Sequence, residues 1–391
     1  MGKTVQSHPI WDILYGFCVY INELSVININ LNTKLNKKMK KLSLIFVALM
    51  LFGLVTKAQN TWTVDNNANS GAQFTSLQAA IDDENVVDGD ILLVSGSATS
   101  YGSIILNKSL KLIGPGHHPQ KDIPVTAKIS SISLKVKIIN FIDTVSNTDN
   151  SSIDGFEING MLRDYYGANN IIIKNNSFVF DNFIVIDLNE NSNNFLIMSN
   201  YIIGYGAWYV FGIYNASNIH ILNNIIRHNS TIVYHSNSST VTISNNIFLY
   251  GFSCNTITNA LFTNNIFYTG SGSWIDFSGV INCTLNNNIS QIDLPTGTNN
   301  GSNNLNLPYP MFINVPINDH DFSWSYNYQL SETSPGHNAG TDGTDIGPFG
   351  GAYPISTTGE PKLPIIELFN INNPIIPLDS VLNIHIKVSN H

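Results

Sequence analysis

Short blocks of alternating apolar and polar residues recur through the middle of the chain, and each block ends in Asn-Asn or Ser-Asn. The first block spans residues 171–178, and five similar blocks follow up to residue 290. The second asparagine of the blocks falls at Asn176, Asn200, Asn224, Asn246, Asn265 and Asn288, with intervals of 24, 24, 22, 19 and 23 residues. Alternation with a period of two, together with many Ile, Val and Phe residues, predicts β-strands.

A repeat of about 22 residues has the length of one coil built from three short strands and three turns. We therefore predict an all-β fold, a right-handed parallel β-helix whose coils stack along one axis. Asparagine tolerates the left-handed backbone conformation of tight turns, and its amide both donates and accepts hydrogen bonds. The repeated asparagines are expected to stack as a ladder at one corner. The alternative, a low-complexity Asn-rich tract, does not explain why the pair follows an alternating apolar triplet.

The apolar interior of a solenoid needs a cap at each end. Residues 74–83 fit a short amphipathic helix at the N-terminal end, with Leu77, Ala80 and Ile81 on one side. Either Thr75 or Ser76 can serve as its N-cap. The Gly-rich run 342–351 is expected to close the other end.

These features assign the β-helix domain to residues 59–356 and a Pro-containing linker to residues 357–364. Residues 365–391 alternate again between apolar and polar side chains. They resemble the start of a C-terminal β-module, which is either truncated or packed on the solenoid, because so short a segment cannot form a sandwich alone.

Residues 39–58 have a basic start, an apolar run and a small residue before Gln59. This pattern is typical of a secretory signal peptide, and the apolar run is short for a membrane span. We interpret Met39 as the true start and residues 1–38 as an upstream extension. The alternative is a buried apolar helix after a genuine extension. The protein is therefore expected to be secreted or exposed at the cell surface.

Charged residues make up only 12% of the chain, so its polar surface is largely neutral. From Gln59 onward, 25 Asp and Glu stand against 11 Lys and Arg, a net charge of −14. This balance argues against nucleic acid and anionic membranes as partners. We expect a monomer with no membrane span once the leader is removed. Cys283 aligns with an inward position, which favours a free buried thiol over a disulfide with Cys254.

The opening stretch 74–116, the Asn-bearing coils and the closing stretch 334–351 together resemble the pectate-lyase-like right-handed β-helix superfamily. They are similar in particular to exported β-helix proteins of Bacteroidetes-type bacteria. The resemblance covers roughly residues 63–354. It implies the fold but not one chemistry, because that superfamily includes polysaccharide lyases, galacturonan hydrolases, pectin methylesterases, epimerases and non-catalytic surface proteins.

In this superfamily the working groove lies along the outer face of one sheet. We assign that sheet to the strands between the Asn turn of one coil and the triplet of the next. Aligning the inward residues of these strands predicts an outward row of Asp187, Tyr214, His235 and Ser278, with Asp276 in the neighbouring row. Asp187, His235 and Asp276 are therefore candidate catalytic residues.

The remaining candidate for catalysis is Arg227, the only Lys or Arg from residue 175 to residue 361. A Ca²⁺-assisted uronan lyase needs a basic residue and several carboxylates in its groove. The scarcity of basic residues weighs against such a lyase, unless Arg163 or Lys174 reaches the groove. A galacturonan hydrolase needs close carboxylates, and the Asp-Asp pair of this chain falls in the expected helix. No motif supports Ca²⁺, so no cofactor is assigned.

Several other polar runs are interpreted without a functional role. Arg227 and His228 are interpreted as part of a solvated turn, and the two histidines at 117–118 as exposed. The run Asp319-His320-Asp321 resembles a metal-ligand cluster, but neighbouring strand residues face opposite ways. A polar loop is therefore the favoured interpretation of residues 319–321.

Tyr165, Trp208 and Trp274 lie near predicted turns and, with Tyr214, are candidates for stacking on sugar rings. Core packing is the alternative for each. The favoured function is an exported β-helix that binds a polysaccharide or cell-surface glycan, or serves as a surface or matrix module, without clear catalytic residues. The alternative is a polysaccharide-degrading enzyme, either a pectate-lyase-like lyase or a glycoside hydrolase.

Overall fold

The computed structural model describes most of the chain from Gln59 onward. The described ranges are 59–119, 125–134, 147–180, 184–206, 208–229, 231–236, 239–270, 275–361, 364–371 and 384–390. The interpreted leader and upstream extension (1–58), Trp274 and the side chain of His235 lie outside what the structure describes. Within the described part, no helix is long and apolar enough to cross a bilayer.

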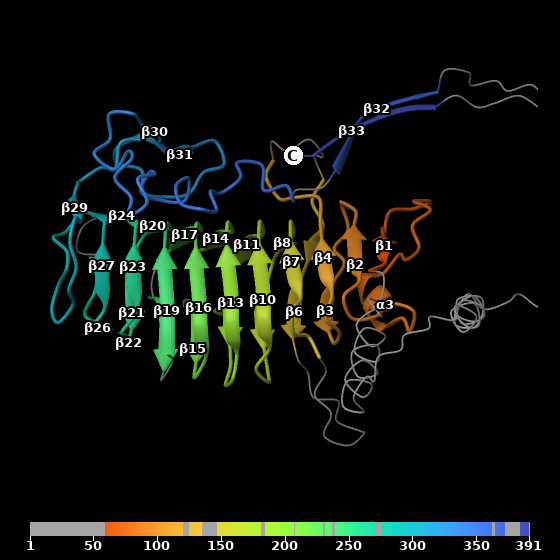
Figure 1. Cartoon of the computed structure of the whole chain (residues 1–391), viewed down its shortest axis with the longest axis horizontal. Helices are drawn as coiled ribbons and strands as arrows, with labels where there is room; N and C mark the ends of the chain where they lie inside the picture. The colour runs from red at the N-terminus through yellow and green to blue at the C-terminus, as the bar shows by residue number, and fades with distance from the viewer. Residues whose placement is uncertain are drawn as a thin grey trace, which may run out of the picture. The chain divides into compact units, whose positions relative to one another are not determined.

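The described residues form a right-handed parallel β-helix in which three all-parallel sheets run along the stacked coils (Figure 1). Sheet A contains β1 (Thr61–Val64), β2 (Ile91–Val94), β4 (Lys111–Ile113), β7 (Ser152–Asp154), β10 (Asn169–Lys174), β13 (Asn193–Met198), β16 (Ser217–Leu222), β19 (Ser239–Ser244), β23 (Leu261–Thr263) and β27 (Thr284–Asn286). Sheet B contains β3 (Ser103–Leu106), β6 (Ser131–Leu134), β9 (Leu162–Asp164), β12 (Ile184–Leu188), β15 (Tyr209–Tyr214), β18 (Thr231–Ser236), β21 (Phe252–Asn255) and β25 (Ile275–Asp276). Sheet C contains β5 (Lys128–Ile129), β8 (Glu157–Ile158), β11 (Ser177–Phe180), β14 (Tyr201–Gly204), β17 (Ile225–His228), β20 (Ile247–Tyr250), β24 (Ile266–Thr269), β28 (Ile289–Ser290) and β29 (Leu305–Asn306).

Each central coil contributes one strand to sheet B, then one to sheet A, then one to sheet C. The alternating triplets form sheet A, where Ile173, Ile197 and Ile221 are register partners and are fully buried. Two short strands, β22 (Ile257–Thr258) and β26 (Val280–Ile281), pair between later coils. Both Cys254 and Cys283 are buried free thiols, as the inward alignment of Cys283 indicates.

The repeated asparagines stack at the corner between sheets A and C. The Asn200 amide donates to Asn224 Oδ1 at 3.0 Å and to the carbonyl oxygen of Ile173 at 2.9 Å. Asn200 Oδ1 in turn accepts from the backbone and side-chain nitrogens of Asn176. The same bonds continue from coil to coil through residues 246, 265 and 288 to Asn304. We call this fully buried stack the inner ladder.

The residue before each inner-ladder asparagine, and not the ladder asparagine itself, takes the left-handed conformation. These residues are Asn175, Ser199, Asn223, Asn245, Asn264, Asn287 and Asn303, with φ between 51° and 58°. The expectation that one asparagine both turns the chain and stacks is therefore wrong, because the two tasks fall on adjacent residues. The pair Asn-Asn recurs because asparagine suits both positions.

A six-residue helix, α3 (Leu77–Asp82), lies near the N-terminal coils, and Ser76 caps it by accepting from the Ala79 amide. Its buried side consists of Leu77, Ala80 and Ile81, the three residues that the sequence pattern selects. The Gln78 side chain forms hydrogen bonds with the backbone N–H and the carbonyl oxygen of Ile105 in β3, which is an edge strand of sheet B. Whether this helix acts as the cap of the solenoid stays a prediction.

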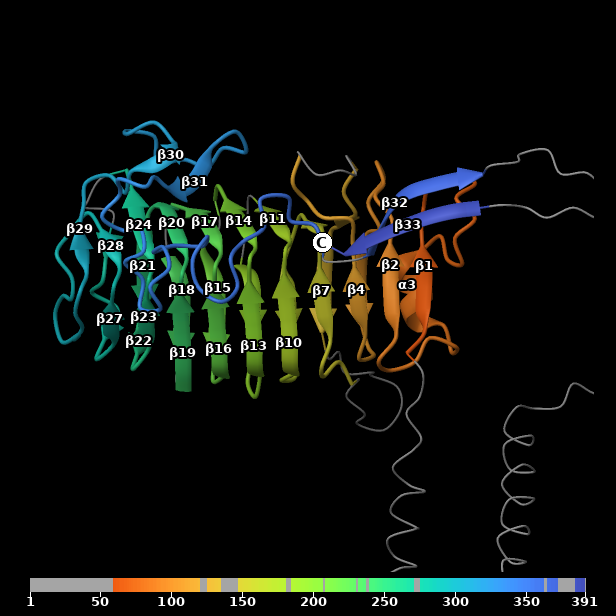
Figure 2. The same cartoon turned by 45° about the horizontal axis from the view of Figure 1, so that its top comes forward.

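Residues 308–355 cover the outer face of sheet C and include the antiparallel pair β30 (Phe312–Asn314) and β31 (Asn327–Leu330) (Figure 2). We call these residues the C-terminal segment. They bury an outward apolar row of sheet C that includes Ile225, Ile247 and Ile266. The Gly-rich run within the segment lies along the corner of the coils rather than across their end. Asn223 donates to the carbonyl oxygens of residues 348 and 350, and Asn287 donates to that of residue 339.

The last described strands, β32 (Pro364–Ile371) and β33 (Ile384–Asn390), form an antiparallel pair. This pairing agrees with the strand character expected for residues 365–391. Whether these strands begin a separate module stays a prediction.

Candidate functional site

The outer face of sheet B is the predicted groove, since its strands lie between the Asn corner of one coil and the triplet of the next. The C-terminal segment packs on sheet C instead, through a second apolar cluster that includes Tyr201, Phe312 and Tyr328. Sheet B is thus the sheet whose outer face the C-terminal segment leaves open, and its candidate site lies across β9, β12, β15 and β18.

The observed register of sheet B differs from the predicted row. Asp187 is the register partner of Arg163 and Gly212, and Gly212 is the partner of Tyr234. The predicted row placed Tyr214 and His235 beside Asp187. The alignment of inward residues paired Phe211 and Ile213 with residues 184 and 186. In the structure they pair with residues 186 and 188, two positions later in the chain. In β12, a shift by two residues preserves the apolar pattern, because strand side chains alternate with a period of two. In β18, Phe211 and Ile213 pair with residues 233 and 235 rather than with the predicted 232 and 234, so Tyr234 takes the place in the row that the alignment gave to His235.

The correct register creates an ion pair on the sheet surface. Arg163 Nε lies 2.7 Å from Asp187 Oδ2. Asp187 is only 8% exposed, yet its second oxygen, Oδ1, has no hydrogen-bond partner among the described residues. A β-carbon at Gly212 would lie 2.6 Å from this oxygen. The absence of a side chain at Gly212 thus lets the Asp187 carboxylate and the Tyr214 ring pack directly over its backbone.

Three tyrosines lie beside Asp187 and Gly212. The hydroxyl groups of Tyr209 and Tyr214 are 2.6 Å apart, and the rings of Tyr209 and Tyr234 stack with centroids 5.0 Å apart. A β-carbon at Gly212 would lie 3.0 Å from the Tyr214 ring. Burial, followed by the hydrogen bond with Tyr209, raises the pKa of Tyr214. Tyr214 therefore stays protonated at neutral pH and serves as a hydrogen-bond donor rather than a base.

Exposed aromatic residues flank the same face. Trp208, just before β15, is 70% exposed, and Tyr165, just after β9, is 39% exposed. The guanidinium carbon of Arg163 lies 5.5 Å from the centre of the Tyr165 ring. Of the four predicted stacking residues, Tyr165, Trp208 and Tyr214 therefore border the sheet B face, while Trp274 is outside the described residues. We call Arg163, Asp187, the three tyrosines and these flanking rings the sheet B site.

The other carboxylate candidate is too far from Asp187 to work with it. Asp276 lies in β25, four strands along sheet B, which corresponds to about 19 Å at about 4.8 Å per strand. Paired carboxylates of glycosidases lie about 5–9.5 Å apart. Asp164 is closer, but it is fully buried and accepts from Ala168 and Ser192. His235 has a buried residue, Ile213, as its register partner.

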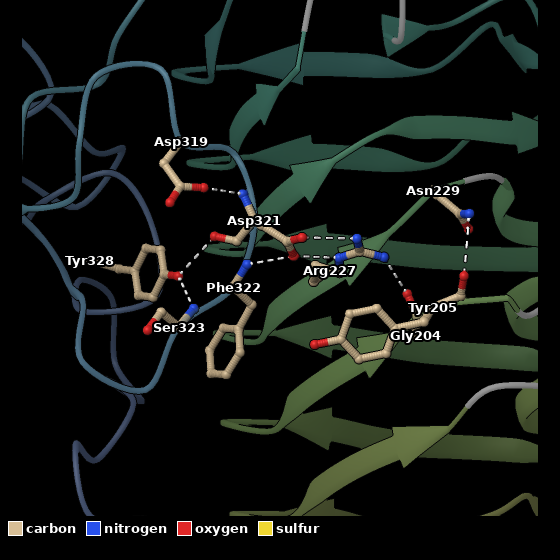
Figure 3. Close-up of polar contacts among 9 residues, drawn as sticks. All are labelled: Gly204, Tyr205, Arg227, Asn229, Asp319, Asp321, Phe322, Ser323 and Tyr328. Carbon is tan, nitrogen blue, oxygen red and sulfur yellow. Dashed lines mark hydrogen bonds and ion pairs between the residues drawn. The ribbon is translucent and has the colours of Figure 1, made fainter.

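Arg227 belongs to a different site, on sheet C (Figure 3). It donates to both carboxylate oxygens of Asp321, at 2.6 and 3.1 Å, and to the carbonyl oxygen of Gly204 at 2.8 Å. Its guanidinium carbon lies between the rings of Tyr205 and Tyr250, at 4.5 and 4.3 Å from their centres. Arg227 therefore ties the C-terminal segment to the solenoid, and the prediction that it acts in catalysis finds no support in this placement.

Two interpretations of polar runs are wrong. Arg227 and His228 are buried in β17 rather than solvated in a turn. His117 and His118 are buried against Trp324 and Tyr201 rather than exposed. The C-terminal segment covers Arg227 through Asp321, and the two histidines at 117–118 through Trp324. Its long-range packing has no periodic signal in the sequence. His228 alternates with Arg227 in β17 and falls on the same side as the interior residue Ile226.

The residues of the 319–321 run bind three different partners. Asp319 accepts from Tyr326 and from the Asp321 amide, while Asp321 accepts from Arg227. His320 stacks on Tyr268 with ring centres 4.3 Å apart, and burial lowers its pKa. Across the described part of the chain, no group of three or more His, Cys, Asp or Glu side chains could hold a metal ion.

The sequence pattern gave no role to Gly212 or Tyr234, and it indicated Arg163 only as a residue that could reach the groove. One signal could have found the ion pair, because Arg163 and Asp187 are 24 residues apart, the interval of the first two ladder steps. No protein-family model matches this chain, and no curated protein matches it significantly. The function is therefore argued from the fold and the site residues.

Proposed function

We propose that this protein is an exported β-helix of the pectate-lyase-like type that binds a neutral glycan along the outer face of sheet B. The observation that carries the proposal is the cluster on this face, in which the Arg163–Asp187 ion pair lies over Gly212 beside three tyrosines. In this interpretation the protein holds the glycan without cleaving it.

The chemistry of the sheet B site suits sugar hydroxyl groups. Arg163 can donate to hydroxyl oxygens, and the tyrosine hydroxyl groups can donate and accept, while Asp187 holds the guanidinium in place. The stacked tyrosines and Trp208 offer apolar ring faces that match the apolar face of a pyranose. Arg163 is already neutralised by Asp187, so the site has no net positive charge for a polyuronate. A neutral glycan therefore fits better than an acidic one.

Binding is favoured over catalysis by the residues on this face. Among the described side chains of β9, β12, β15 and β18, Asp187 is the one carboxylate that the site can use, and hydrolysis by the usual mechanism needs two. Tyr214 is held protonated, which removes the nearest alternative base. Export is supported by the leader-like residues 39–58 and by the resemblance to secreted β-helix proteins.

Replacing Asp187 with alanine is expected to weaken binding of a neutral polysaccharide by about tenfold or more, because a charge-assisted hydrogen bond is lost. The Gly212→Val variant is expected to abolish binding, since its side chain would displace the Asp187 carboxylate and the Tyr214 ring. Affinity electrophoresis of residues 59–391 in gels containing a panel of neutral polysaccharides would measure both effects. Glu84→Ala, which removes an exposed carboxylate outside sheet B, is the matched control and should bind like the wild type.

Two outcomes would contradict this proposal. If neither Asp187→Ala nor Gly212→Val alters binding while thermal melts show both variants folded, the site lies elsewhere. If the wild-type protein generates reducing ends or unsaturated products from a polysaccharide, and Asp187→Ala abolishes them, the protein is a degrading enzyme instead.

A further inference from the structure

A separate cavity lies on the outer face of sheet C, near its N-terminal strands, and has a volume of about 340 Å³. Its lining includes Lys128, Glu157 and Ser177 from the sheet, and His117 and Trp324 from segments that pack over it. This volume falls in the range of small-molecule pockets, about 300–1,000 Å³. The cavity is on a different sheet from the sheet B site.

The polar lining results from a change from polar to apolar residues along one outward row of sheet C. Lys128, Glu157 and Ser177 are successive register partners, so they are spaced by about 4.8 Å along the axis. The next partners in the same row are Tyr201 and Ile225, which the C-terminal segment buries. The row is thus polar where it faces the cavity and apolar where it is covered.

The polar groups in the cavity are balanced in charge and incompletely bonded. Lys128 Nζ lies 3.5 Å from Glu157 Oε1, and Thr126 donates to Glu157 Oε2 at 2.9 Å. Ser177 is only 2% exposed, yet its hydroxyl has no hydrogen-bond partner among the described residues. A buried hydroxyl without a partner is costly, so a ligand atom that bonds to it would be favoured.

We infer that this cavity is a second saccharide site, which binds one or two rings of a neutral sugar. The inference rests on the proposed glycan-binding function. Glu157, Lys128 and Ser177 would bond to the hydroxyl groups, and Trp324 and His117 contribute aromatic lining for the apolar side of the ring. The compensated pair of Lys128 and Glu157 favours a neutral ligand, because an ion would have to compete with the opposite charge.

Two saccharide sites on different sheets would let one molecule hold two glycan chains at once. An open face accepts the interior of a long chain, whereas a cavity of this size accepts only a short segment. Such a protein would cross-link glycans, as a matrix module does, and linked sites raise the overall avidity.

Titration calorimetry with glucose, galactose, mannose and xylose and their disaccharides would test this inference. We expect at least one of these sugars to bind the wild type and the Asp187→Ala variant equally. Glu157→Gln is expected to weaken that binding by about tenfold or more, since a charge-assisted bond is lost. Glu332→Gln, an exposed glutamate outside the cavity, is the matched control and should bind as the wild type does.

Ser177→Ala provides a second variant if Glu157→Gln proves unstable, because it removes only the unpartnered hydroxyl. Weaker sugar binding in Ser177→Ala, with an unchanged melting temperature, would support the second site. The inference is overturned if no sugar binds the wild type, or if neither variant changes its affinity. Polysaccharide binding that depends on Asp187 would survive that result, so the sheet B proposal can succeed where this one fails.

Discussion

Replacing Asn224 with leucine is expected to lower the free energy of unfolding by about 4 kcal/mol, at about 1 kcal/mol for each of four lost hydrogen bonds. The Asn224 amide donates to Ile197 O and Asn246 Oδ1, at 2.9 and 3.0 Å. Its oxygen accepts from both nitrogens of Asn200, at 2.9 and 3.0 Å. All of these groups are buried, so water cannot replace the missing partner.

Urea unfolding followed by circular dichroism would measure this loss as a lower midpoint at constant slope. Asn229→Leu is the matched control, since Asn229 is exposed and makes one 3.4 Å bond to Tyr205 O. A surface change of this kind is expected to shift stability by less than about 0.5 kcal/mol. Equal stability of the two variants would show that the inner ladder contributes nothing to the coil stack.

The Asp321→Ala substitution is expected to lower the free energy of unfolding by about 2 kcal/mol and to loosen the C-terminal segment. It leaves the Arg227 side chain, which is 6% exposed, without its carboxylate. Breaking a fully buried ion pair costs about 3–5 kcal/mol. The estimate is lower here because the Asp321 side chain is 45% exposed, so water already screens the pair.

Hydrogen exchange of residues 308–330 would report the loosening directly, with Glu332→Ala as the control on an exposed carboxylate. The double variant Arg227→Leu, Asp321→Ala should recover part of the lost stability, because the unpaired buried charge is gone. If the segment exchanges as slowly in Asp321→Ala as in the wild type, the tie between Arg227 and Asp321 does not hold it.

The difference in the free energy of unfolding between the wild type and Asp321→Ala is expected to depend on pH. Burial raises the pKa of Asp321, but hydrogen bonds from Arg227 and from the Phe322 amide lower it more, so the folded pKa lies below the usual value. The stabilisation is therefore fully present above the unfolded pKa of about 3.9, and it is lost as the pH falls through the folded pKa. The stability difference between wild type and Asp321→Ala should stay constant from neutral pH to about pH 5 and shrink below about pH 4.

The stacked coils and the ladder could be predicted because their signals are local and repeated. An apolar triplet followed by Asn200 or Asn224 specifies a strand, a turn and a buried amide within a few residues. The coupling of Arg163 to Asp187 was missed because register shifts of two residues leave the pattern of apolar residues unchanged. The cover over sheet C was missed because Asn223 meets Gly350 across 127 residues, with no periodicity to relate them.

The inner-ladder amides all point the same way along the axis. Each Nδ2 donates toward the following coil, and each Oδ1 accepts from the preceding one, from Asn176 as far as Asn304. A coil that has folded therefore presents a vacant N–H to its successor, and the next coil arrives with the matching acceptor. Assembly becomes vectorial, each layer templating the next. A chain interrupted between two coils would leave the N–H donors of its last coil unpaired, and a coil of another molecule could bind to them.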